Sequence, residues 1–391
     1  MWLSNFRVVL ADRVLPRGSV RVEGTRIAEI RETPVADAEC DGGGLLLMPG
    51  FIDMHGDMIE REVEPRPGVR MPMELGLRDL DRRLKVAGVT TAYAAVSFQP
   101  GSAYGHIRSF DNTMAMLRAL KSMRGELLVD HRVHARFEVT FPDALSVVEE
   151  LIAEGTVDLV SLTDHTPGQG QYRDIERHAG FIAKTKGVSA DEAMAMVQAR
   201  IDEKRSTTGD MMATISAISA ICAEHGMALA SHDDDTVEKV ALMQKIGATI
   251  SEFPVSLEAA AEARKRGLAT AMGAPNALRG VSYSGNLSAR EAYAAGVLDM
   301  LAADYHPSAI LPAVLAMAGG DLPASTRLAS LNPARALGLA DRGEIATGKL
   351  ADLLIADDRG VGHVRATLRR GAPIFSDGSL RFDPAPSPVT A

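Results

Sequence analysis

The sequence predicts an α/β protein in which a (β/α)8 TIM-type barrel carries a small β-sandwich domain formed by the N- and C-terminal segments. Three observations lead to this prediction. The middle of the chain alternates short apolar runs with amphipathic helical stretches, both ends contain short strand-like runs split by tight turns, and ligand-type side chains follow several of the apolar runs. Strands that alternate with helices indicate a parallel sheet with crossover helices, and eight repeats over roughly 260 residues are typical of a closed barrel.

Strand-like runs occur at both ends of the chain. Near the N-terminus they are Phe6–Leu10, Ser19–Val22 and Arg26–Ile30. Residues 343–355 predict a strand, a turn and a second strand, and the tail from Pro384 is expected to be disordered. We therefore expect residues 1–48 and 343–391 to form one composite β domain around a barrel of residues 49–342.

The middle of the chain contains eight candidate barrel strands, with helical patterns between them such as Glu74–Ala87 and Ala213–His225. In a (β/α)8 barrel the catalytic groups lie at the carboxyl ends of the strands. The candidate strands are Gly50–Met54, Thr90–Val96, Val133–Val139, Val157–Thr163, Met227–Ser231, Ala248–Phe253, Ala269–Gly273 and Leu298–Ala303.

One connection, residues 166–210, is longer than a simple crossover and is rich in basic residues. A solvated helical excursion and a lid-like insertion over the barrel mouth both fit this composition. The basic residues include Arg173, Arg177, His178, Lys184, Lys186, Lys204 and Arg205.

Composition and charge exclude several classes of function. With 46% hydrophobic and 24% charged residues the chain has the composition of a soluble globular protein, and its net charge of −9 argues against a nucleic-acid or anionic-membrane surface. Two cysteines, Cys40 and Cys222, allow neither a disulfide framework nor a thiolate zinc site. The sequence lacks the pattern of a signal peptide and any apolar run of membrane length, so we expect a cytoplasmic protein.

The triplet His55-Gly56-Asp57 is the first candidate metal motif. It ends the apolar run that begins at Met48. Side chains two residues apart on a strand point the same way, so the imidazole and the carboxylate can share one ion. Zinc and manganese both accept these ligands.

The third predicted strand carries His134, Arg136 and Glu138 on one face. A polar stripe inside a barrel is unfavourable unless it is paired or bound to metal. We predict Glu138 as a metal ligand, Arg136 as a substrate-facing residue and His134 as a packed core histidine.

Three further strand ends supply ligand-type residues: His165, His232 and Asp304. His165 is preferred to Asp164 because only one of two neighbouring residues can point inward, and His232 precedes three acids after an apolar strand. Asp304 is a ligand or a general base, and Glu252 is a weaker ligand candidate. The remaining histidines are interpreted as structural or surface residues: His106, His131, His178, His225 and His363.

This pattern resembles the amidohydrolase superfamily of metal-dependent hydrolases over nearly the whole chain, including Pro49–His55 and Gly348–Asp352. The resemblance implies one or two divalent metal ions, with zinc favoured and manganese or iron open, and a role for Asp304 in orienting a water and accepting its proton. Two departures are clear. The usual His-x-His is His-x-Asp here, and the bridging carboxylated lysine has no counterpart, which leaves Glu138 as the substitute.

Six longer motifs narrow the resemblance: Glu64–Pro67, Ser161–Gln169, Ala230–Asp234, Glu252–Pro254, Met272–Gly280 and Ser284–Asn286. In this order they are similar to the triphosphate diphosphatases of the carbon–phosphorus lyase pathway. The similarity implies hydrolysis of α-D-ribose 1-methylphosphonate 5-triphosphate to the 5-phosphate and pyrophosphate.

The segment after the seventh predicted strand independently suits a polyphosphate. It contains glycines and leads into a helix expected near Ala289, with Ser288 as a candidate N-cap. Free backbone N–H groups at a helix start favour phosphate oxygens, although an ordinary glycine-rich connection has the same appearance. Arg70 after the first strand is a further possible contact. The predicted substrate-binding residues are Arg66, Arg136, Arg279, Ser284, Gly285 and Asn286.

Two other functions fit parts of the sequence. A hydrolase of C–N bonds would use the same metal chemistry but would not need several arginines at the barrel mouth. A non-catalytic scaffold subunit would be expected to lose metal ligands, whereas this chain keeps a full set. The expected partner is a small sugar phosphonate triphosphate, without nucleic acid or membrane, and a homodimer is common among proteins of this resemblance.

Overall fold

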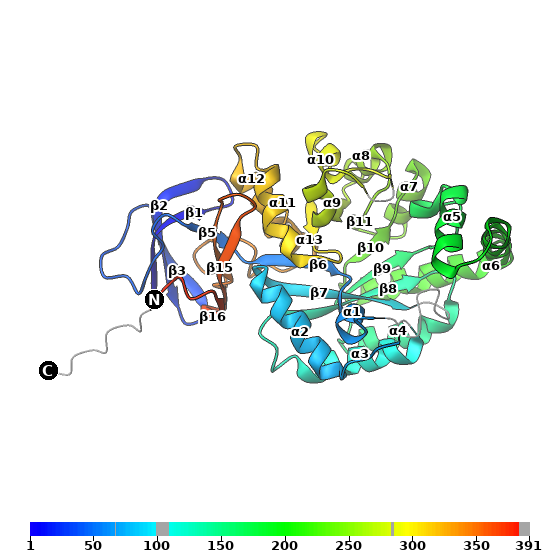
Figure 1. Ribbon diagram of the computed structural model, residues 1–391, viewed down its shortest axis with the longest axis horizontal. Coiled ribbons are helices and arrows are strands. Elements are labelled where there is room, and N and C mark those ends of the chain that lie inside the picture. Colours follow the sequence, from blue (N-terminus) through cyan, green and yellow to red (C-terminus); the bar gives the residue numbers. More distant parts are fainter. Residues whose placement is uncertain (67, 99–108, 283–284, 383–391) are drawn as a thin grey trace.

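The structure, a computed structural model, describes residues 1–66, 68–98, 109–282 and 285–382. It consists of a barrel with surrounding helices and a smaller β-sheet body at one end of the molecule (Figure 1). The N-terminus lies at the side of the smaller body (Figure 1). Within the described residues, every helix is either too short or too polar to cross a membrane.

Eight parallel strands form the barrel sheet in sequence order, from β6 to β13. The ring closes between its first and last strands: the N–H of Asp304 donates to the carbonyl of His55 at 2.9 Å, and the N–H of Asp57 donates to the carbonyl of Asp304 at 2.7 Å. Each predicted strand overlaps an observed one, which confirms the (β/α)8 barrel. The strands are β6 (Phe51–Gly56), β7 (Val89–Phe98), β8 (Asp130–Glu138), β9 (Leu159–Thr163), β10 (Leu229–His232), β11 (Ile250–Glu252), β12 (Ala269–Gly273) and β13 (Met300–Ala302).

Helices cover the outside of the barrel, and many of them begin at side-chain caps. Ser109, Thr236 and Ser256 each accept a backbone N–H three residues later, as good N-cap residues do. The helices are α1 (Ile59–Val63), α2 (Met73–Val86), α3 (Phe110–Met123), α4 (Leu145–Ala153), α5 (Ile175–Lys186), α6 (Ala190–Glu224), α7 (Val237–Lys245), α8 (Leu257–Lys265), α9 (Ala274–Arg279), α10 (Ala289–Ala294), α11 (Ile310–Met317), α12 (Leu322–Arg327) and α13 (Leu331–Ala336). Three-residue 3-10 helices are η2 (Pro142–Ala144), η3 (Gly170–Tyr172) and η4 (Pro307–Ala309).

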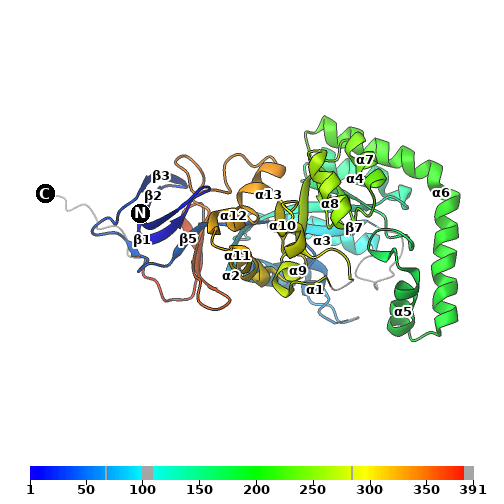
Figure 2. The ribbon, with the colours of Figure 1, turned by 90° about the horizontal axis from the view of Figure 1, so that it is seen from above.

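The long connection between β9 and β10 contains η3, α5 and α6. The last third of α6 packs on the barrel through buried Ile215, Ile218 and Cys222. Its first part extends along the outer edge of the molecule beside α5 (Figure 2), and the two helices share a small apolar cluster centred on Ala179 and Val197. That this connection acts as a mobile lid stays a prediction.

The smaller body is one mainly antiparallel sheet built from both ends of the chain, as predicted. Its order is β16-β15-β14-β5-β1-β2-β3, with β4 beside β1. The exact domain boundaries at residues 48 and 343 stay a prediction. The strands are β1 (Trp2–Val9), β2 (Val14–Glu23), β3 (Arg26–Arg31), β4 (Cys40–Asp41), β5 (Leu46–Pro49), β14 (Leu353–Asp357), β15 (His363–Arg369) and β16 (Ala372–Ser376).

The predicted strand at the start of residues 343–355 is wrong. This segment has turns at Gly343 and Gly348, both with left-handed backbone, and only Leu350 makes a bridge, to Arg26 of β3. Its backbone groups bond to the β3 end instead: the N–H of Ile27 donates to the carbonyl of Lys349 at 2.9 Å. The second predicted strand is β14, and the tail from Pro384 lies outside the described residues.

The two bodies are joined without a linker at Gly50, between β5 and β6. The N–H of Gly50 donates to the carbonyl of Asp352 at 2.8 Å. A Cβ atom at this position would lie 2.5 Å from the side chain of Thr90 on β7. Only a residue without a side chain allows this close approach of the junction to the barrel.

Replacing Gly50 with alanine should therefore destabilise the protein by about 1–3 kcal/mol, because the methyl group overlaps Thr90 in a packed region. Denaturation in urea, followed by circular dichroism, measures this change. Gly125→Ala is the matched control, since a Cβ there meets no atom within 4 Å. Equal midpoints for the two variants would contradict the junction argument.

Candidate metal centre

A cavity of about 260 Å³ opens at the carboxyl ends of the barrel strands. Polar and charged side chains from most of the strand ends line it. They are His55, Asp57, Arg136, Gln171, His232, Asp233, Asn276, Arg279, Ser282, Asn286, Asp304 and Tyr305, with Phe253, Pro254, Val255, Met272, Gly273 and Leu287 as the remaining wall. A larger cavity of about 790 Å³ lies at the opposite end of the barrel, and none of the predicted ligands lines it among the residues described.

Three strand ends at the cavity have left-handed backbone at residues other than glycine. The φ angles are 53° at Asp233, 53° at Phe253 and 54° at Asp304. Such conformations are unfavourable by about 1–3 kcal/mol and cluster at functional sites. Here they lie at the ends of β10, β11 and β13, where the chain turns and places these side chains in the cavity wall.

The buried carboxylate of Glu252 lies among three histidines. Its Oε2 is 3.0 Å from Nδ1 of His232, and its Oε1 is 3.4 Å from Nδ1 of His55 and 3.6 Å from Nε2 of His134. A carboxylate behind a histidine fixes the orientation of the ring. Because Nδ1 of both His55 and His232 faces Glu252, their Nε2 atoms are the ones left for a metal ion.

Burial sets the protonation of this group. It lowers the pKa of His232 well below the usual range, lowers the pKa of His134 to about 3, and raises the pKa of Glu252. The imidazole of His232 is therefore neutral at neutral pH. A neutral imidazole is the form that binds metal.

The ring of Phe253 packs against the imidazoles of His55 and His232. Its ring meets His55 at 4.9 Å and His232 at 5.3 Å between centroids, in both cases edge to face. The two imidazoles stack at 5.6 Å. Edge-to-face contacts of this kind are favourable and restrict ring rotation.

Glu138 and His165 form a second close pair. Nδ1 of His165 lies 2.6 Å from Oε2 of Glu138, and the backbone N–H of His165 donates to Oε1 at 3.2 Å. The hydroxyls of Thr140 and Thr163 donate to the same carboxylate at 3.1 and 3.4 Å. The structure thus brings together two residues that the sequence predicted as ligands from separate strands.

The aspartates of the first and last strands meet at the seam of the barrel. Burial and the nearby charge of Asp57 raise the pKa of Asp304 to about 7, while Arg136 opposes this shift. Asp53 accepts the N–H of His55 at 3.1 Å and that of Ala303 at 2.8 Å. Arg136 lies 3.6 Å from Asp57 through its Nη1 atom.

These residues fit a divalent metal. Two groups have ligand atoms that all lie within 4.8 Å of one another: His55, His134 and Glu252 in one, and His165, His232 and Asp233 in the other. Imidazole and carboxylate donors suit zinc, manganese and iron. Sequence reasoning did not select Asp233, because nothing in the run of three acids shows that the first has left-handed backbone beside His232.

The predicted substrate residues are only partly brought together. Arg136, Arg279 and Asn286 line the cavity, and Gly285 adjoins Asn286. Ser284 lies outside the described residues. Arg66 is exposed in the loop after α1 and does not line the cavity.

Two further expectations about phosphate contacts need correction. Arg70 bonds to Glu64 at 3.2 Å and to Asn112 at 3.0 Å, away from the cavity. Ser288 does precede a helix, but its hydroxyl donates to the carbonyl of Gly280 and does not cap it. Instead Asn276 accepts the N–H of Ala289 at 3.0 Å, so the first amide of this short helix is already bonded.

Two of the histidines predicted as structural, His134 and His131, are buried and have hydrogen-bond partners. His134 is buried, with Nδ1 3.2 Å from the carbonyl of Met54 and Nε2 2.9 Å from the hydroxyl of Ser161. His131 lies 3.1 Å from Asp81. His106 lies outside the described residues.

Comparison with known proteins agrees with the family resemblance seen in the sequence. The model of the amidohydrolase family matches residues 87–379. Alpha-D-ribose 1-methylphosphonate 5-triphosphate diphosphatase from Escherichia coli (strain K12) is 34% identical over 389 residues, which cover 96% of this chain and 100% of that protein.

Solved structures share the fold at low sequence identity. N-acetyl-D-glucosamine-6-phosphate deacetylase from Mycobacterium smegmatis has a TM-score of 0.63 and 18% identity, covering 96% of this chain and 100% of that one. Dihydropyrimidinase from Brevibacillus agri NCHU1002 has a TM-score of 0.59 and 14% identity, covering 96% and 95%. At these identities the two structures support the fold alone.

Glu252→Gln should lower metal affinity about 10–100-fold, because an amide carries only one acceptor oxygen for the two imidazoles that face the carboxylate. Metal content after dialysis against graded chelator, measured by mass spectrometry, reports this change. Glu258→Gln, on the exposed face of α8, removes the same charge and is the control. Equal metal retention by both variants would show that Glu252 does not orient the ligands.

Proposed function

This chain belongs to the amidohydrolase family, and on that premise we propose that it hydrolyses α-D-ribose 1-methylphosphonate 5-triphosphate to the 5-phosphate and pyrophosphate. The observation that carries the proposal is the cavity itself, where guanidinium groups of Arg136 and Arg279 share one wall with the metal-binding groups. The full-length relative from Escherichia coli, named for this reaction, supports the same substrate.

The proposed metal ligands are His55, Asp57, Glu138, His165, His232 and Asp304, with Asp233 as a further donor beside His232. Zinc is the proposed ion, although manganese and iron accept the same ligands. When bound, a divalent ion makes a water acidic near neutral pH and offsets the charge of a phosphoryl group.

Asp304 is the proposed general base. Its carboxylate lies in the cavity wall beside the other proposed metal ligands, where it can accept a proton from an attacking water. The backbone bonds of Asp304 to His55 and Asp57 hold this carboxylate in register with the first strand. Attack in line on the α-phosphorus would then release pyrophosphate.

Arg136 and Arg279 are the proposed phosphate-binding cations. Arg136 is nearly buried and close to Asp57, so it can hold an oxygen near the reacting phosphorus. Arg279 ends α9 and is exposed at the cavity rim, where it can meet the leaving pyrophosphate. One guanidinium group can donate to two phosphate oxygens at once, which stabilises the bound substrate and the negative charge on the leaving pyrophosphate.

Phosphorus NMR of the metal-loaded protein should show pyrophosphate as the first product from the ribose phosphonate triphosphate. ATP, run in parallel, should react more slowly. If the triphosphate is unchanged although metal is shown to be bound, the proposal is contradicted and hydrolysis of a C–N bond is favoured. A neutral substrate of that kind would need neither Arg136 nor Arg279.

Asp304→Asn should lower kcat by about 10²–10⁴-fold, because the amide cannot take up a proton. Circular dichroism should be unchanged and most of the metal retained, since the other proposed ligands remain. Asp111→Asn, an exposed carboxylate in the first turn of α3, is the control with the same change. Near-normal turnover in Asp304→Asn would exclude it as the base.

A further inference from the structure

The start of the long insertion is fixed to the barrel mouth at three points. The N–H of Gly170 donates to the carboxylate of Asp235 after β10, at 2.7 Å. The ring of Tyr172 lies 6.1 Å from His165 and 4.2 Å from His178 of α5. These contacts hold the start of the insertion beside the cavity, and Gln171 is the residue of this segment that lines it.

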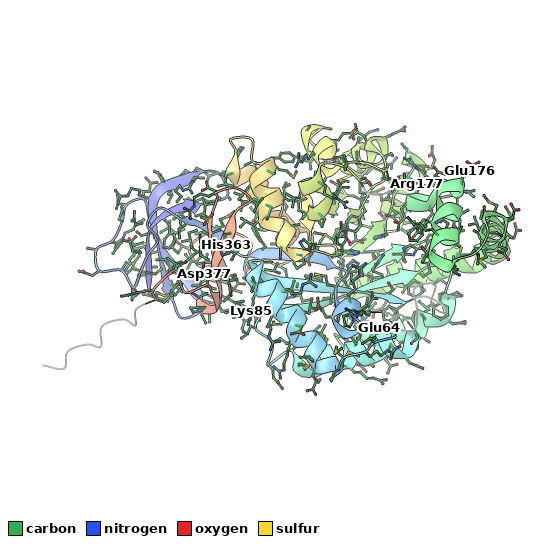
Figure 3. All side chains as sticks on the ribbon, viewed as in Figure 1. Glu64, Lys85, Glu176, Arg177, His363 and Asp377 are labelled. Atoms are coloured by element: carbon green, nitrogen blue, oxygen red, sulfur yellow. The ribbon has the colours of Figure 1, made fainter. Side chains whose placement is uncertain are left out.

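Arg177 of α5 provides the third contact, with the loop after β12. Its Nη1 atom lies 2.7 Å from the position that a Cβ atom of Gly285 would occupy. Gly285 has a φ of 76°, a backbone conformation that favours glycine, and a Cβ atom at this position would displace the guanidinium of Arg177. In Figure 3 Arg177 lies on the barrel side of α5, whereas its neighbour Glu176 points away.

The position of Arg177 matters because its positive charge lies near the part of the cavity where the distal phosphates of a triphosphate would lie. Asp57, Asp233 and Asp304 line one part of the cavity, where their negative charge favours a metal ion and, through that ion alone, the reacting phosphate. The two distal phosphates of a triphosphate must then extend towards the rim. There Arg279 and Asn286 line the cavity, and Asn286 directly follows the glycine that Arg177 contacts.

We propose that Arg177 is a specificity residue through which the insertion binds the distal phosphates and selects a triphosphate over shorter phosphates. This inference rests on the proposed function and extends it to a residue outside the barrel strands. A guanidinium is suited to this role because it donates to two phosphate oxygens at once and keeps its charge at every physiological pH.

The test uses the metal-loaded full chain and two probes, the ribose phosphonate triphosphate for turnover and inorganic tripolyphosphate for binding by calorimetry. Arg177→Ala should raise KM and weaken tripolyphosphate binding about tenfold or more, with kcat within about threefold and orthophosphate binding unchanged. Lys186→Ala removes a cation of the same helix nine residues later, on its opposite face, and should change neither value.

Gly285→Ala provides an independent measurement, because its methyl group would displace the guanidinium of Arg177. It should raise KM in the parent protein and add little in an Arg177→Ala background, since residues in contact are not additive. Full additivity of the two changes, or a lower kcat without a change in tripolyphosphate affinity, would overturn the specificity role.

The outcomes separate this inference from the proposed function. Turnover of the triphosphate with an unchanged KM in Arg177→Ala overturns the inference alone. Absent turnover with tripolyphosphate binding that depends on Arg177 overturns the proposed reaction and supports the inference. A parent protein that neither turns over the triphosphate nor binds tripolyphosphate overturns both.

Discussion

The carboxylate of Glu252 is the constraint on which the barrel mouth depends. It is fully buried, and a buried charge is strongly unfavourable unless other groups pair with it. His232 of β10 is its hydrogen-bond partner, and His55 of β6 and His134 of β8 lie within 3.6 Å of it, so residues of three strands meet at this carboxylate. Because Nδ1 of both His55 and His232 points towards this carboxylate, their Nε2 atoms point away from it. Phe253, the next residue, packs edge to face against His55 and His232 and has left-handed backbone.

The fold could be predicted from the sequence because its signals are local. Apolar runs separated by helical patterns mark the eight strands, and the carboxyl ends of parallel strands must meet at one edge. That geometry is sufficient to gather His55, His232 and Asp304 in one cavity. It also places Glu138 against His165, although neither the distance nor the supporting threonines can be read from the chain.

The errors arose where a side chain or a turn depends on a distant partner. Glu252 was predicted only as a weaker ligand candidate because its partners come from three other strands, and Asp233 was not selected because its backbone conformation has no sequence signal. Ser288 precedes a helix as expected, yet Asn276 from α9 takes over the cap. The segment from residue 343 has strand-like composition but forms turns at its glycines and makes a single bridge to the start of β3. Contacts such as that of Arg177 with Gly285 are equally invisible before the fold is known.

The composite sheet has a consequence for folding during synthesis on the ribosome. β5 pairs with β1 on one side and with β14 on the other, and roughly 300 residues separate β5 from β14 along the chain. At a ribosomal rate of about 5–20 residues per second, this edge of β5 waits about 15–60 s for its partner. Throughout that time an apolar strand edge is open to other nascent chains. The last strands made are therefore the ones that end the period of greatest exposure to aggregation.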